Sequence, residues 1–217
     1  MRHLFIVAHP DDEILGCGGI ITRLKKAGDY VSVAVLCCSI RTRENCLKET
    51  VLDMHRRLGI DNTYCFDYVA MKLNEYDRLE LTQTIEDVVL KEQPDTIYTH
   101  DLNDIHIDHR TLYQLVIEAS KLPLRQVNPM AKRIKAIYTI EVPSSTDWGS
   151  GFVPNAFVEI PEEALEIKAR LLEEYTDVIR SVPHPRNIES FKALARYRGG
   201  QCGCRYAEAL KKVFEYQ

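Results

Sequence analysis

Two short clusters of polar residues in this sequence have side chains that could bind a metal ion. One is AHPDDE at positions 8–13, directly after the apolar run LFIV, and the other is HIDH at positions 106–109, after the apolar run TIYT at 96–99. Imidazole and carboxylate are the ligands of catalytic zinc, which usually takes three protein ligands and leaves a fourth position for water or substrate. Together the two clusters predict a His–Asp–His zinc site.

The first cluster offers two carboxylates that could act differently. Pro10 fixes one backbone torsion and sharpens the turn, so that neighbouring side chains face different directions. If His9, Asp12 and His109 hold zinc, Asp11 is placed to accept a proton from a water molecule that the metal acidifies. This arrangement predicts a hydrolase.

The second cluster contains another histidine that could assist such a reaction. His106 lies three residues before His109 and could, as a cation, stabilise the oxyanion of a tetrahedral intermediate, while Asp108 could hold its ring. An isolated Asp-Asp pair more often caps a helix, and an isolated His-x-x-His more often lies on a solvated loop. The occurrence of both clusters after predicted strands favours one shared site over these structural interpretations.

Length and composition predict one globular domain over residues 1–217. The chain is 45% hydrophobic and 28% charged, which are globular values. The net charge of −4, with both signs interspersed, lacks the basic footprint of nucleic-acid binders, so no nucleic acid is expected as a partner. There is no signal-type segment at the start and no apolar run of membrane-spanning length, which predicts a cytoplasmic protein without a membrane span.

The cysteines of the chain are expected to be reduced. Their number, seven, is odd, and they lie mostly in apolar or helical stretches, which does not suggest a disulfide framework. Cys202 and Cys204 are one residue closer than the usual C-x-x-C pair, and no second pair accompanies them. A metal or redox role for this pair is therefore not expected.

Apolar runs that alternate with stretches of helical period predict an α/β fold, with a mostly parallel sheet covered on both faces. Strands are expected at 4–8, 31–37, 63–66, 96–100, 136–141 and 157–160. Helices are expected at 12–26, 44–58, 75–91, 108–121, 162–179, 188–197 and 206–214. In such sheets the ligand crevice lies outside the carboxyl ends of the strands, where both polar clusters, Ser39, Asp101 and the loop 144–151 would emerge.

With these motifs in place, the sequence resembles the LmbE-like or PIG-L-like family of zinc-dependent N-acetylglucosamine deacetylases. The resemblance rests on AHPDDE at 8–13 and HIDHR at 106–110, and continues through FVEI at 157–160, the following helix with Lys168, Tyr175, PHPR at 183–186, RGG at 198–200 and YAEA at 206–209. It implies a Rossmann-like sheet with the active site at the carboxyl edge of the strands. The segment LNDI at 102–105 replaces a glycine or proline often found before the second motif, so substrate contacts there are expected to differ.

The resemblance also implies roles for individual residues. The zinc ligands would be His9, Asp12 and His109, with Asp11 as general base. The electrophile that polarises the acetyl oxygen would be His106, supported by Asp108, and a substrate-binding arginine would be Arg43, which could equally be a surface residue. The same ligand set also accepts other divalent ions such as Fe²⁺ or Co²⁺.

The implied activity is removal of the N-acetyl group from an N-acetylglucosamine-type amino sugar or its conjugate, by metal-activated water. The partner would be this small-molecule substrate, and assembly into a homo-oligomer stays open. One alternative is an amidase that acts on another acyl amino sugar or a thiol conjugate with the same metal site. A non-catalytic sugar- or nucleotide-binding module would leave Asp11 and His106 without a role.

Three further features invite a functional interpretation. GCGG at 16–19 follows the first strand about a turn too late for dinucleotide binding and lacks the order G-x-G-x-x-G, so it predicts close helix packing instead. Trp148, in a loop rich in Gly and Ser, could stack on a sugar face or pack its own loop. Tyr113 is expected in the core.

Overall fold

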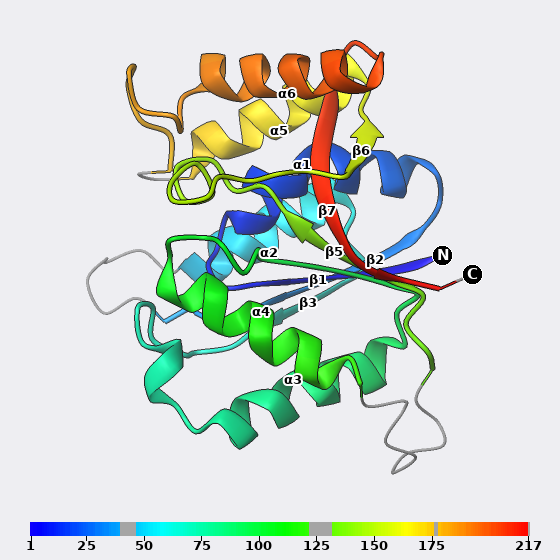
Figure 1. Cartoon of the computed structure of the whole chain (residues 1–217), viewed down its shortest axis with the longest axis vertical. Helices are drawn as coiled ribbons and strands as arrows, with labels where there is room; N and C mark the ends of the chain where they lie inside the picture. Colours follow the sequence, from blue (N-terminus) through cyan, green and yellow to red (C-terminus); the bar gives the residue numbers. More distant parts are fainter. Residues whose placement is uncertain (40–46, 122–131, 176–177, 217) are drawn as a thin grey trace.

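A seven-stranded sheet with helices on both faces forms the framework of the protein (Figure 1). The computed structural model describes residues 1–39, 47–121, 132–175 and 178–216. In the order β3-β2-β1-β4-β5-β7-β6, the first five strands run parallel and β7 is antiparallel to both of its neighbours. The strands are β1 (Arg2–Val7), β2 (Tyr30–Val35), β3 (Asn62–Cys65), β4 (Thr96–Thr99), β5 (Ala136–Ile140), β6 (Ala156–Glu159) and β7 (Ala207–Glu215). The predicted α/β class with a mostly parallel sheet is confirmed.

Helices cover the two faces of this sheet and enclose two apolar cores. They are α1 (Asp12–Lys26), α2 (Leu47–Leu58), α3 (Arg78–Glu92), α4 (Ile107–Ala119), α5 (Glu162–Glu174) and α6 (Ile188–Cys202), with a short 3₁₀ helix η1 (Leu73–Glu75). Figure 1 shows α3 and α4 on one face and α1 and α2 on the other, with α5 and α6 beyond α1. Successive residues of a strand point to opposite faces, so Phe5 of β1 enters the core beneath α1 and Leu4 enters the core beneath α4.

The carboxyl ends of β1 and β4 form the point at which the strand order reverses. β1 lies between β2 and β4, and the chain leaves β1 toward α1 on one face and β4 toward α4 on the other. Ligands of open α/β sheets bind in the crevice outside such a switch point. The two polar clusters follow these two strands, so the fold itself brings them together.

The predicted helix at 206–214 is wrong, because this segment forms β7. Its sequence, AEALKKVFE over Ala207–Glu215, consists largely of good helix formers, so local propensity favours a helix. In the protein β7 instead pairs with β5 on one side and β6 on the other, and its first four residues are buried. Pairing on both edges outweighs a local preference worth only a few tenths of a kcal/mol per residue, about 0.7 at most.

Several helix boundaries differ from the predicted ones for local reasons. α3 begins at Arg78 because the Asp77 side chain accepts a hydrogen bond from the Glu80 N–H, which caps the helix. The predicted helix at 162–179 ends at Glu174, where Tyr175 becomes extended. α6 runs to Cys202, five residues further than expected at 197, and ends at Gly203 in the left-handed conformation. Within the described residues, no helix has the length and apolar character needed to cross a bilayer.

Candidate metal centre

The first polar cluster forms a tight turn between β1 and α1. Asp11, at the N-terminal end of α1, has φ 106°, a strained backbone conformation for a residue with a Cβ. The backbone N–H of His9 donates to Oδ2 of Asp12 at 2.9 Å, which holds this carboxylate beneath the turn. The side chains of Asp11 and Asp12 are both buried. The turn thus presents two neighbouring carboxylates in different settings, as the spacing predicted.

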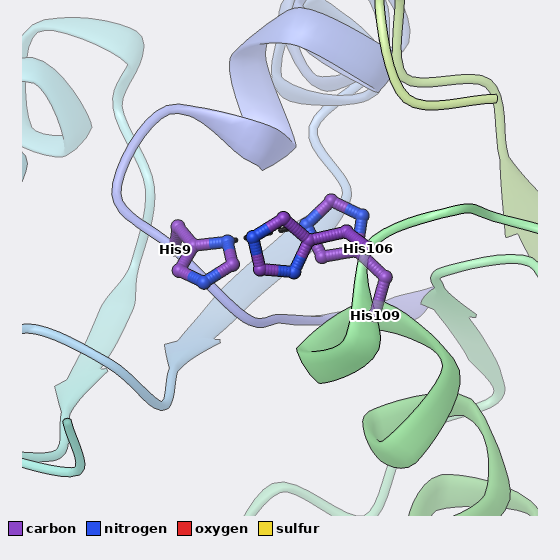
Figure 2. Close-up of side chains that lie close together, drawn as sticks. All are labelled: His9, His106 and His109. Carbon is purple, nitrogen blue, oxygen red and sulfur yellow. Dashed lines mark hydrogen bonds between the residues drawn. The ribbon is translucent and has the colours of Figure 1, made fainter. Parts of the chain in front are cut away.

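The second cluster lies at the start of α4. His106 is the N-terminal cap, and its Nδ1 accepts a hydrogen bond from the Asp108 N–H at 3.2 Å. His109 is in the first turn of the helix and is almost fully buried. Figure 2 shows the ring of His9, from the turn after β1, directly facing the rings of His106 and His109. Residues about a hundred positions apart therefore share one site.

The donor atoms of His9, Asp12 and His109 have the spacing of ligands around one small ion. Nδ1 of His9 lies 3.1 Å from Nε2 of His109 and 3.3 Å from Oδ2 of Asp12. The same Oδ2 lies 3.2 Å from Nε2 of His109. Ligand atoms bound tetrahedrally at zinc distances are about 3.3 Å apart, so the set fits this ion in geometry as well as in chemistry. The three residues would leave one tetrahedral position to a further ligand.

Carboxylates around this centre create a field that favours positive charge. Burial alone would lower the pKa of His9, but hydrogen bonds with Asp108 and Asp12 raise it to about 10. Burial is likewise outweighed at His109, whose pKa is raised by Asp12 and Asp104. For Asp12, burial favours the neutral acid, but His109 and His100 hold its pKa well below the usual range. The carboxylates therefore favour positive charge at this cluster of side chains.

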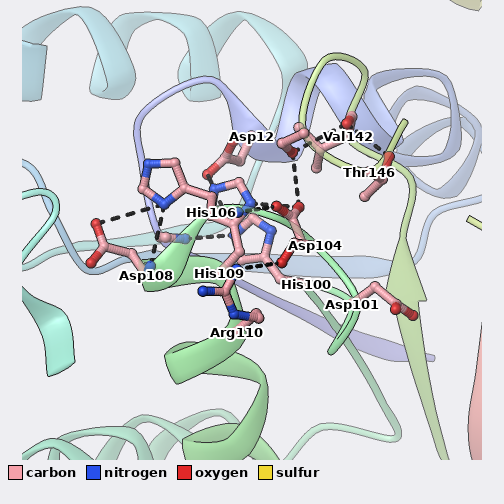
Figure 3. Close-up of polar contacts among 12 residues, drawn as sticks. Asp12, His100, Asp101, Asp104, His106, Asp108, His109, Arg110, Val142 and Thr146 are labelled. Carbon is pink, nitrogen blue, oxygen red and sulfur yellow. Dashed lines mark hydrogen bonds and ion pairs between the residues drawn. The ribbon is translucent and has the colours of Figure 1, made fainter. Parts of the chain in front are cut away.

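Asp104 supports the centre from behind His109, a role that was not predicted. Its Oδ2 accepts hydrogen bonds from Nδ1 of His109 at 2.7 Å and from Oγ of Ser145 at 2.8 Å, and its Oδ1 accepts from the His106 N–H (Figure 3). A carboxylate on the remote nitrogen fixes the tautomer and the orientation of a ligating imidazole. The sequence offers two aspartates shortly before His109, Asp101 and Asp104, and nothing in their spacing indicated which of them would reach the histidine.

His100 is a second unpredicted member of the site. It is fully buried, its ring stacks on that of His109 with centroids 3.7 Å apart, and its Nε2 accepts the Ala8 N–H at 2.9 Å. Burial and the charge of His109 lower the pKa of His100 to about 4, so its ring is neutral at physiological pH. His100 thus ties the end of β1 to the loop after β4.

Asp108 contacts His9 more closely than it contacts His106. Its Oδ2 lies 2.9 Å from Nε2 of His9 but 4.0 Å from Nδ1 of His106. The carboxylate also accepts the backbone N–H groups of Met71 and Leu73, at 2.6 and 3.0 Å. This geometry associates Asp108 with the orientation of a candidate ligand and with the segment before α3.

His106 is the most exposed of the three clustered histidines. Its ring centroid lies 4.5 Å from that of His9 and 4.6 Å from that of His109. Burial and the positive charges of His109 and His9 lower the pKa of His106 to about 4. Because Nδ1 accepts the Asp108 N–H, the ring proton of a neutral His106 lies on Nε2. The electrostatics favour a neutral hydrogen-bond donor over the cation suggested by the sequence.

Asp11 lies beside an arginine from a distant loop. Nη1 of Arg186 is 3.8 Å from Oδ2 of Asp11, while its Nε donates to Oγ of Ser144 at 2.7 Å. Burial and the charge of Asp12 raise the pKa of Asp11 well above its usual range, and Arg186 opposes this shift. Arg186 occurs in the PHPR segment quoted above, but nothing in the sequence indicated that it would reach Asp11.

Cys37 lies close to His9 and Asp108. Among the described residues, three sets of side chains place potential ligand atoms within 4.8 Å of one another: His9, His106 and His109; His9, Cys37 and Asp108; and Asp12, His100 and His109. Burial and the charge of Asp108 raise the pKa of the Cys37 thiol, which disfavours the thiolate that binds metals. The lone pair of His100 Nε2 is engaged by Ala8. Neither residue improves on the His–Asp–His set.

Three other positions singled out in the sequence are Arg43, Tyr113 and Trp148. Arg43 falls outside the described residues. Trp148 is 65% exposed in the loop after β5, and Tyr113 is half-buried on α4. Neither is among the residues that surround the candidate ligands.

Comparisons with known proteins place the sequence in a defined context. Residues 4–120 match the family described as "PIG-L: GlcNAc-PI de-N-acetylase". The chain is 27% identical over 184 residues to the "Uncharacterized deacetylase YaiS" of Escherichia coli K12, covering 79% of this chain and 89% of that protein. It is also 27% identical over 225 residues to the diacetylchitobiose deacetylase of Thermococcus kodakarensis, covering 97% of this chain and 82% of the relative.

Solved structures of several proteins share the fold. The conserved protein TT1542 of Thermus thermophilus superposes with a TM-score of 0.82 at 23% identity, covering 100% of this chain and 97% of its own. The N,N'-diacetylchitobiose deacetylase of Pyrococcus horikoshii superposes with a TM-score of 0.73 at 24% identity, and the match covers 97% of this chain and 83% of the deacetylase. The 4-carboxy-2-hydroxymuconate hydratase GalB of Pseudomonas putida superposes with a TM-score of 0.79 at 20% identity, and the match covers 100% of this chain and 98% of the hydratase. Since a hydratase and a deacetylase share this fold, the fold alone does not decide the reaction.

Proposed function

Since the chain belongs to the PIG-L (GlcNAc-PI de-N-acetylase) family, we propose that it is a metal-dependent deacetylase that removes the acetyl group from the nitrogen of an N-acetylglucosamine-type sugar or its conjugate. The observation that carries the proposal is the triangle of His9 Nδ1, Asp12 Oδ2 and His109 Nε2, with edges of 3.1 to 3.3 Å, next to the separate carboxylate of Asp11. The curated deacetylases to which the chain is similar agree with this chemistry.

In the proposed reaction His9, Asp12 and His109 hold zinc or a similar divalent ion. When bound, this ion would act as a Lewis acid toward the acetyl carbonyl and make water more acidic. The protein contributes the three ligands, and Asp104 and Asp108 orient His109 and His9 respectively. The carboxylates also supply the negative field that such an ion requires.

Asp11 would serve as the general base and then as the general acid. It would take a proton from the attacking water and deliver it to the departing sugar nitrogen, so that acetate and a free amine are released. Burial and the charge of Asp12 raise the pKa of Asp11 well above its usual range, which favours this return of the proton. Arg186, 3.8 Å from the carboxylate, keeps its ionised form accessible.

His106 would stabilise the developing oxyanion by donating its Nε2 proton. A neutral imidazole is able to do this, since a preorganised hydrogen-bond donor stabilises developing negative charge without being a cation. The Asp108 N–H holds Nδ1 of His106 and so fixes the tautomer. The backbone of Asp108 thus supports His106, while its carboxylate supports His9.

The test is acetate release from a panel of N-acetylglucosamine derivatives, including the free sugar, the disaccharide and glycosides with an inositol or lipid aglycone. The zinc-loaded protein should release acetate, and the chelated protein and Asp11→Asn should not. Loading with Fe²⁺ or Co²⁺ in parallel would identify the most active ion. Binding of stoichiometric zinc without reaction on any acetyl sugar would instead favour another acyl group, and N-formyl sugars and thiol conjugates in the panel would reveal it.

A further inference from the structure

α1 is kinked one turn after the candidate metal ligand Asp12. Cys17 has φ −139° and ψ 18°, which is not helical, and the helix continues on the far side of this residue. In an unbroken helix the N–H groups of Gly19 and Ile20 would donate to the carbonyls of Leu15 and Gly16. A kink separates these groups, and each needs another partner because this part of α1 is buried.

An ion pair from two other elements fits into the kink. Glu208 of β7 accepts the Gly19 N–H on Oε1 at 3.0 Å and the Ile20 N–H on Oε2 at 2.7 Å. Nζ of Lys168, on α5, donates to the Leu15 carbonyl and to Oε1 of Glu208, both at 2.7 Å. The side chains of Lys168 and Glu208 are 8% and 5% exposed. Both backbone donors and one freed acceptor of the kink are therefore satisfied from outside the helix.

The glycines of GCGG make room for this pair. A Cβ atom on Gly18 would lie 3.0 Å from Cγ of Lys168, and one on Gly19 would lie 3.1 Å from Cδ of Glu208 and 2.7 Å from Cδ1 of Ile160. Larger residues would push the two charged side chains out of reach of the backbone. The GCGG motif, which suggested only close helix packing, thus leaves the space in which Lys168 and Glu208 reach the backbone of α1.

We infer that Lys168 and Glu208 are positioning residues for the metal centre: by holding the kink, they direct the first turn of α1 and place Asp12 against His109. This inference rests on the proposed metal site. A buried ion pair is a poor source of net stability, since apolar residues of similar volume often stabilise a fold as well or better. Apolar residues could not, however, accept two N–H groups and donate to a carbonyl at the kink.

A second buried ion pair provides a matched control. Arg198 of α6 binds Glu141, which directly follows β5, and their side chains are 11% and 8% exposed. Both residues line the same small cavity as Lys168 and Glu208. Their side-chain hydrogen bonds, in the part of the chain that the structure describes, connect them to each other and to Gln201 rather than to α1. Glu141→Gln therefore breaks a comparable pair without removing any of the hydrogen bonds that Lys168 and Glu208 make to the kink.

The experiment measures the affinity of the metal-free full chain for zinc by competition with a chelating dye. Glu208→Gln preserves volume but replaces one acceptor of the kink with a donor, and should weaken zinc binding about tenfold or more. Glu141→Gln should bind zinc within about threefold of the unmodified protein, although both changes destabilise the fold. The visible absorption of bound Co²⁺, which reports coordination geometry, should change at saturation in Glu208→Gln only.

Each remaining outcome has a definite meaning. If Glu208→Gln does not fold, the double variant Lys168→Met/Glu208→Gln, which buries no unpaired charge, should fold and show the same loss of affinity. Unchanged zinc affinity and an unchanged Co²⁺ spectrum in either folded variant would overturn the inference but leave the proposed function intact. An unmodified protein that bound no zinc would reject the proposed metal site, and the inference with it.

Discussion

Nδ1 of His109 lies 2.7 Å from Oδ2 of Asp104, and this contact determines which nitrogen of His109 faces the metal centre. With its proton on Nδ1, the ring presents the lone pair of Nε2 toward Oδ2 of Asp12, 3.2 Å away. The same carboxylate of Asp104 holds Ser145 from the loop after β5. The buried side chain of Asp104 thus connects the candidate ligand His109 to the loop after β4 and the loop after β5.

Asp104→Asn should weaken zinc binding by about tenfold, toward the lower end of the effect usual for a partner of a ligating histidine. The amide is a weaker acceptor and can also turn its NH₂ group toward Nδ1, which destabilises the required tautomer. Competition with a chelating dye measures the change. Asp101→Asn is the matched control, since Asp101 lies in the same loop but binds Thr139 and Asn103. Equal affinities in the two variants would reject this role for Asp104.

Asp108→Asn separates two interpretations of the second motif. The family resemblance assigns Asp108 to His106, whereas in the structure its carboxylate lies 2.9 Å from Nε2 of His9. If the Asp108 carboxylate orients His9, the substitution should weaken zinc binding about tenfold. If the carboxylate acts only on His106, Asp108→Asn should lower kcat in the zinc-saturated enzyme and leave the zinc affinity unchanged. Affinity measured without substrate, followed by kcat at saturating zinc, distinguishes the two.

Much of the fold followed from the sequence because the central strands β1 and β2 contain buried apolar runs. β4 lies within the predicted segment 96–100, β1 begins at Arg2, two residues before the predicted segment 4–8, and α1 has the predicted bounds of 12 and 26. The two motifs follow those two strands, so their meeting at the switch point could also be expected. β7 could not be predicted, because its helix-forming residues are held in a strand by pairing with β5 and β6.

The supporting contacts of the site were less accessible from the sequence because they depend on tertiary packing. The N–H groups that fix Asp108 belong to Met71 and Leu73, in a segment with no periodic pattern. Glu208 reaches α1 from the strand that was mistaken for a helix. Residue type and spacing therefore indicated the candidate ligands, while the residues that orient them depended on which loops and strands become neighbours.

Asp95 should make the stability of the protein depend on pH in the acid range. Burial opposes ionisation of this carboxyl, but Lys132 and the Arg2 N–H lower its pKa to about 2, from an ordinary value of 3.8. A lowered folded-state pKa stabilises the protein fully above the unfolded value and loses its effect as pH falls through the folded value. Asp95→Asn should thus cost about 2 kcal/mol at pH 7 and about half as much at pH 3.

Urea unfolding of the metal-free protein at pH 7, 4 and 3 measures this effect. Asp53→Asn is a suitable control, because Asp53 is half exposed and pairs with Arg56 on the surface of α2. Its loss should cost less than about 1 kcal/mol at any of these pH values. A difference between Asp95→Asn and the unmodified protein that stayed constant from pH 7 to pH 3 would show that the Lys132 and Arg2 contacts do not lower this pKa.

Asp11→Asn should abolish turnover while leaving the metal in place. The carboxylate of Asp11 is not one of the three atoms that form the ligand triangle, and asparagine tolerates the left-handed backbone, φ 106°, better than most residues do. Loss of a general base lowers kcat by about 10² to 10⁴. Acetate release at saturating substrate and zinc content by elemental analysis report the two properties separately. Asp11→Ala should be equally inactive and also less stable, by about 1 kcal/mol, since alanine lacks this tolerance. Near-normal turnover in either variant would remove Asp11 from the mechanism, whereas loss of zinc from Asp11→Asn would make Asp11 a ligand or a support of one.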